Sequence, residues 1–109
     1  MARQDSFQGA IPLLVLKILA RRGPLHGYSL TTHIKQMSRD VLNVEEGSLY
    51  PALHRMEEAG LIKANWLITD KNRRARVYEI TRAGMKELDE EESRWRSVSM
   101  AIGRVLKEA

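Results

Sequence analysis

Apolar residues recur at helical spacing in the first half of the chain, where they predict three helices. The first should begin near Ile11 and end at Gly23-Pro24, because Pro12 suits a first helical turn and a Gly-Pro pair ends a helix. The second should open at His26-Gly27-Tyr28 and end near Ser38. Its apolar stripe, at steps of about one helical turn, consists of Leu30, Ile34 and Met37.

The third helix is predicted from Glu46 to Ala59, with Gly60 as the left-handed residue past its end. Its buried stripe should be Leu49, Leu53 and Met56. The opposite face carries hydroxyls, an imidazole, a guanidinium and an aromatic ring, groups that can contact phosphates and base edges. The residues on that face are Ser48, Tyr50, Pro51, His54 and Arg55. An ordinary solvated face would have a similar composition, and Tyr50 could instead pack its ring against a neighbouring hairpin.

Beyond the third helix the apolar residues alternate with polar ones, which predicts strands. The first strand spans residues 62–68 and the second spans residues 76–80, with a polar, basic loop between them. Two strands joined in this way form a hairpin, and Trp66 should pack on it. A further small strand is expected at residues 41–44, between the second and third helices.

The last predicted helix spans residues 82–108, and Thr81 can cap its start. Its apolar residues recur near the 3.5-residue repeat with which a helix packs along a partner helix. They are Leu88, Trp95, Val98, Ile102 and Val105, with a break at Glu91-Glu92. We therefore expect a dimerisation helix whose interface these five residues form. The alternative is a helix folded back on its own domain.

Positive charge is concentrated at the hairpin. Residues 71–82 hold five bases and one acid, a net charge of +4 that equals the net charge of the whole 109-residue chain. Such a focused basic segment is typical of a surface that binds a polyanion. Arginine suits both phosphate and a narrow minor groove. We expect DNA contacts from Lys71, Arg73, Arg74 and Arg76.

Composition excludes several other classes of protein. The chain has no cysteine, which excludes disulfides, thiolate catalysis and cysteine–zinc sites and favours the cytosol. The sequence contains no run of 18 apolar residues, the length that a membrane-spanning helix would need. His26 and His33 lie two helical turns apart, about 10 Å, too far to share a metal ion. With no nucleophile-elbow or phosphate-loop pattern either, we expect no enzyme, no cofactor and no metal site.

Three helices followed by a hairpin with a basic tip describe a winged helix-turn-helix. The predicted fold is mainly α with a small β-hairpin: a DNA-binding domain at residues 9–81 and a dimerisation helix at residues 82–108. The third helix would enter the major groove, and a homodimer would bind a two-fold-related site on double-stranded DNA. The alternative is a winged-helix protein–protein interaction module, but such modules usually lack a basic wing.

Three motifs carry a resemblance to a known family. They are GPLHGY at residues 23–28, EGSLYPALHRME at residues 46–57 and NRRARVYEIT at residues 72–81. Together they resemble the signature of the PadR family of bacterial transcriptional regulators, over residues 9–108. The resemblance implies a dimeric winged-helix repressor with a single C-terminal dimerisation helix. It also implies a small aromatic or drug-like effector that loosens DNA binding.

The same resemblance assigns roles to individual residues. The polar residues of the third helix match the recognition positions, and the arginines of the hairpin match the wing. Trp95 resembles a tryptophan that, in some short members, faces its dimer mate across a pore and stacks a planar ligand. By its position alone, Trp95 could equally be an interface residue without a ligand, or simply exposed. Many members carry a glycine beside the wing arginines; here Asn72 should take that turn.

Overall fold

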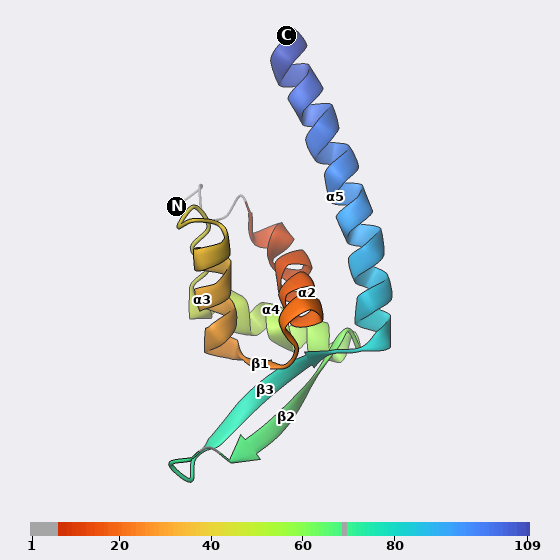
Figure 1. Cartoon of the computed structure of the whole chain (residues 1–109). Helices are drawn as coiled ribbons and strands as arrows, with labels where there is room; N and C mark the ends of the chain where they lie inside the picture. The colour runs from red at the N-terminus through yellow and green to blue at the C-terminus, as the bar shows by residue number, and fades with distance from the viewer. Residues whose placement is uncertain (1–6, 69) are drawn as a thin grey trace.

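A computed structural model describes residues 7–68 and 70–109 of the chain. The elements are the 3₁₀ turn η1 (Gln8–Ala10), α2 (Ile11–Arg22), β1 (Leu25–His26), α3 (Gly27–Met37), α4 (Glu46–Glu58), β2 (Ile62–Ile68), β3 (Arg74–Ile80) and α5 (Arg82–Glu108). In Figure 1, α2, α3 and α4 pack together, a hairpin projects below them, and α5 runs away from them. The fold class is therefore confirmed: a winged helix-turn-helix with a long C-terminal helix.

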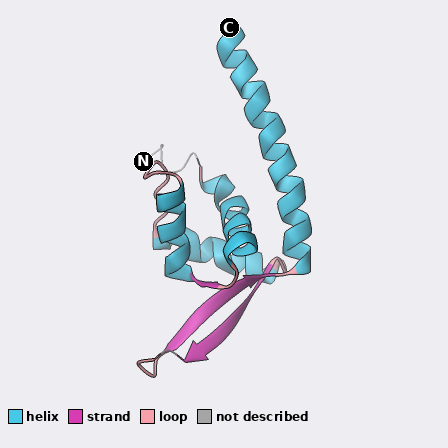
Figure 2. Ribbon diagram, in the orientation of Figure 1, coloured by secondary structure: helices cyan, strands magenta, loops and turns pink. Residues whose placement is uncertain are grey.

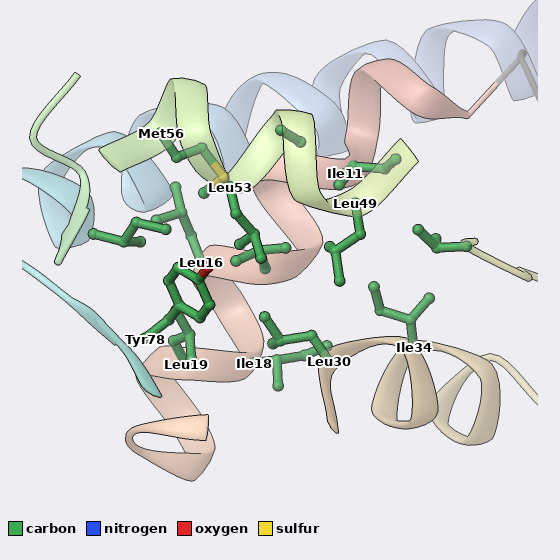
Figure 3. Close-up of a cluster of buried hydrophobic side chains, with 14 of the residues drawn as sticks. Ile11, Leu16, Ile18, Leu19, Leu30, Ile34, Leu49, Leu53, Met56 and Tyr78 are labelled. Atoms are coloured by element: carbon green, nitrogen blue, oxygen red, sulfur yellow. The ribbon is translucent and has the colours of Figure 1, made fainter. Parts of the chain in front are cut away.

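The core lies between the three packed helices and the base of the sheet. Leucines from α2, α3 and α4 meet there, each at most 2% exposed, and the ring of Tyr78 from β3 joins them (Figure 3). The leucines are Leu16, Leu19, Leu30, Leu49 and Leu53. Burial of such a side chain contributes about 1.5–3 kcal/mol, so this cluster fixes how α4 is held. Met37, expected in the stripe of α3, is instead 53% exposed.

The sheet has three antiparallel strands in the order β1-β3-β2 (Figure 2). The pairing of β2 with β3 runs from Ile62 opposite Ile80 to Ile68 opposite Arg74, so β3 begins two residues earlier than predicted. Strand β1 was not predicted. It pairs Leu25 with Tyr78 and so ties the start of α3 to the sheet.

The small strand expected at residues 41–44 was a wrong prediction. Within the described chain these residues belong to the connection from α3 to α4, which opens with two left-handed residues, Arg39 at φ 55° and Asp40 at φ 67°. The apolar residues there do not share one environment: Val44 is 6% exposed, whereas Val41 is 78% exposed. The apolar residues that suggested a strand are therefore one buried residue, Val44, and an exposed turn around Val41.

Helix α5 has a packed start and an exposed remainder. The Oγ1 of Thr81 accepts a hydrogen bond from the backbone N–H of Gly84 at 3.0 Å, the predicted cap. Leu88 is 4% exposed in the core of the chain itself, which corrects its assignment to a dimer interface. From residue 93 to residue 109 every residue is exposed. The alternative expected from the sequence, a helix packed against its own domain, therefore holds only for the first turns of α5.

Candidate nucleic-acid interface

Helix α4 presents the polar face that the sequence predicts, because its apolar stripe is buried. The stripe residues are at most 3% exposed and face α2 and α3. The other side carries exposed Pro51, His54 and Arg55, with Ser48 half-buried near the helix start. The Nε2 of His54 lies 3.4 Å from a carboxylate oxygen of Glu58, and both side chains stay largely exposed. This side of α4 therefore offers donors and acceptors to solvent.

Tyr50 packs on the start of α3 while keeping 40% of its surface exposed. A Cβ at Gly27 would lie 2.7 Å from the Tyr50 hydroxyl and 2.8 Å from its Cε1, so a larger residue at position 27 would displace the ring from this place. Burial raises the pKa of the Tyr50 phenol, and the charge of Glu46 raises it further. The phenol therefore keeps its proton and can donate a hydrogen bond to a phosphate or a base edge.

The wing, residues 62–80, ends in an exposed basic turn. Lys71, Arg73 and Arg74 are all exposed there. Asn72 has φ 58°, so it takes the left-handed turn position as expected in the absence of a glycine. The wing projects away from the packed helices (Figure 1), which leaves its basic turn accessible to a long polyanion.

Arg76 differs from the other wing arginines because its guanidinium contacts helix α4. Its Nη2 donates to both carboxylate oxygens of Glu57 at 2.9 Å. Trp66, which lies opposite Arg76 in the strand register, is 55% exposed and lies beneath the Arg74 guanidinium at 4.6 Å. Sequence reasoning placed Trp66 on the hairpin but missed Glu57, since strand spacing says nothing about which helix residue the hairpin faces.

The outer part of α5 carries an apolar stripe. Trp95, Val98, Ile102 and Val105 are between 46% and 64% exposed. Trp95 lies between two hollows of about 170 and 200 Å³, both of which Leu13 of α2 also lines. An aromatic ring flanked by two small hollows has room for a second flat group beside it.

An ion pair explains the break in the stripe of α5. The Nζ of Lys17, in α2, donates to Glu92 at 3.0 Å, and Arg96 donates to the other carboxylate oxygen at 2.9 Å. The hydrogen bond from Lys17 lowers the pKa of Glu92, so the carboxylate is charged at neutral pH. Glu92 therefore joins α5 to α2 within the chain. Lys17 and Glu92 were not identified from the sequence.

Comparison with known proteins identifies the family. The Transcriptional regulator PadR-like family matches residues 15–90, more than half of the chain. The chain belongs to this family. Transcriptional regulator Rv3488 of Mycobacterium tuberculosis is 38% identical over 85 residues, which cover 78% of this chain and 76% of that protein. Membership of the PadR-like regulators also confirms the expectation that the chain is not an enzyme.

Two further proteins resemble this chain, one in its structure and one in its sequence. A transcriptional regulator from Clostridium thermocellum has a structure with a TM-score of 0.82 at 25% identity, covering 92% of this chain and 93% of its own. The Negative transcriptional regulator PadR of Bacillus subtilis is 27% identical over 70 residues, 64% of this chain and 38% of that protein. Among the described residues of this PadR-like regulator, no helix is long and apolar enough to cross a membrane, and no group of three metal-binding side chains occurs.

Proposed function

We propose that this PadR-like regulator is a cytoplasmic homodimer that binds a two-fold-related operator and represses transcription. One observation carries the proposal: the exposed basic turn of the wing and the exposed polar face of α4 belong to neighbouring elements, which Arg76 of the wing and Glu57 of α4 connect. Residues 9–81 would bind DNA, and residues 82–108 would join the protomers. The name of the Bacillus subtilis relative supports repression.

In this proposal α4 reads bases and the wing supplies affinity. The side chains offered to the major groove are Ser48, Tyr50, Pro51, His54 and Arg55. The side chains offered to phosphates or the minor groove are Lys71, Arg73 and Arg74. Base contacts give sequence preference, whereas contacts to phosphate add affinity that falls as salt rises. A protein-interaction module would have no need for this concentration of charge.

The direct test is fluorescence anisotropy with labelled DNA from upstream of the gene, compared with scrambled DNA, at about 50 and 200 mM salt. We expect a preference for the upstream fragment that persists at the higher salt. Equal binding to both fragments that disappears with salt would contradict sequence-specific recognition. An absence of binding at either salt concentration would favour the protein-interaction module.

The dimer interface is proposed to lie along the exposed stripe of α5. Trp95→Ala should shift the population towards monomers by weakening the dimer by about 2 kcal/mol, a rise of roughly 30-fold in the dissociation constant, since a buried tryptophan is a common interface hot spot. Sedimentation equilibrium measures the change. Met100→Ala is the matched control, because Met100 is 61% exposed but lies on the opposite side of the helix. Equal dimerisation of the Trp95 variant and the native chain would remove Trp95 from the interface.

We also propose that the hollows beside Trp95 accept a planar aromatic effector. The fluorescent probe anilinonaphthalene sulfonate, added without DNA, should bind the native chain and lose most of its enhancement with Trp95→Leu, which keeps an apolar side chain but no ring to stack. Binding that is the same in both proteins would contradict an effector site at this tryptophan.

A further inference from the structure

The guanidinium of Arg76 occupies the corner between the wing and helix α4. Its Nη2 donates to both oxygens of Glu57, and its central carbon lies 5.7 Å from the ring of Trp66 and 5.7 Å from the ring of Tyr78. The partners come from three elements, since Glu57 belongs to α4, Trp66 to β2 and Tyr78 to β3. One side chain thus joins both strands of the wing to the helix that presents the polar face.

Trp66 extends this arrangement towards the tip of the wing. Its ring has the Arg74 guanidinium at 4.6 Å and the Arg76 guanidinium at 5.7 Å. A cation over the face of an indole is attracted by the ring quadrupole, and this restricts where the cation can lie. Arg74 is therefore held above a ring that Arg76 in turn connects to α4.

From these contacts we infer that Glu57, Arg76 and Trp66 form a positioning unit that fixes the wing relative to α4, and that Arg76 acts through this unit instead of contacting DNA. The inference rests on the proposed DNA binding. The wing meets the rest of the protein mainly at its base (Figure 1), so without such a connection its tip would be free to move. A wing fixed in advance loses less conformational entropy on binding, which favours affinity.

The sign of one substitution separates this role from a DNA contact. If Arg76 contacted phosphate, Glu57→Gln would tighten DNA binding, because it removes a negative charge near a polyanion and releases the guanidinium. If Glu57 and Arg76 position the wing, Glu57→Gln should weaken binding by about 3- to 10-fold despite the removed charge. The measurement is the anisotropy titration with the labelled upstream DNA, with circular dichroism to show that the fold is retained. Tighter or unchanged binding would overturn the inference.

Glu58→Gln is the matched control. It removes the same charge from the next position of α4, where the carboxylate contacts only His54 among the ion pairs described and no wing residue. This variant should bind DNA slightly more tightly than the native chain. A double-mutant cycle completes the test: Glu57→Gln should cause no further loss in the Arg76→Gln background, and at most the slight gain expected of Glu58→Gln, because Arg76→Gln has already broken the connection. Additive losses would overturn the inference.

A second readout does not depend on DNA and so separates failure of this inference from failure of the proposed function. In a Trp95→Phe background, Trp66 is the only tryptophan. Glu57→Gln should increase quenching of its fluorescence by acrylamide, because the loosened Arg76 no longer shields the ring, whereas Glu58→Gln should not. Equal quenching in the two variants would show that Glu57 does not order the wing.

Discussion

Replacing both Arg73 and Arg74 with alanine should weaken binding to every DNA sequence, upstream or scrambled. These side chains are exposed at the wing tip, and each arginine that neutralises a phosphate steepens the dependence of affinity on salt. The slope of log affinity against log salt should flatten by about 1 to 2 units per protomer. Anisotropy titrations at several salt concentrations measure both changes.

The control for this pair is the double variant Arg104→Ala/Lys107→Ala. It removes the same charge from the exposed outer part of α5, on the side away from the Trp95 stripe. It should leave the salt slope within error of the native value. If both double variants flattened the slope equally, net charge alone would explain the effect. An unchanged slope in the wing variant would remove Arg73 and Arg74 from the DNA surface.

Replacing Gly84 with alanine should destabilise the fold by about 3 kcal/mol, with a fall in the melting temperature of roughly 10–20 °C. A Cβ at this position would lie 2.1 Å from the carbonyl oxygen of Leu61 and 2.7 Å from Cγ1 of Ile80. That carbonyl also accepts the backbone N–H of Thr81 at 3.1 Å, so it cannot move without loss of another contact. Thermal unfolding at fixed protein concentration measures the change.

Gly103→Ala should act in the opposite direction. Gly103 lies in the same helix, and among the described residues nothing other than the helix's own nearby backbone lies within 4 Å of a Cβ placed there. Alanine is favoured over glycine in a helix interior by up to about 1 kcal/mol, so this variant should be as stable as the native chain or more so. A Gly84 variant no less stable than the Gly103 variant would show that the start of α5 can shift away from Leu61 and Ile80 without cost.

The sequence by itself determined the local structure and the charge. Period-3.6 stripes located α2, α3 and α4, and alternation located the two strands of the wing. The residue types alone also predicted that Thr81 caps α5 and that Asn72 takes the left-handed turn position. These features depend on residues within a few positions of one another, so they can be predicted from the sequence alone.

Tertiary structure decided whatever depends on residues distant in the chain. The two-residue strand β1 has no period of its own and exists because β3 offers it partners. Residues 41–44 pair with no strand in the described part of the chain and stay in a connection. Leu88 and Trp95 occupy the same repeat, yet of these two only Leu88 reaches the core. Glu57 and Arg76, 19 positions apart, meet because the strand register and the packing of α4 together place them in contact. Burial and pairing of this kind are set by the whole fold, so the repeat of a single helix or strand cannot reveal them.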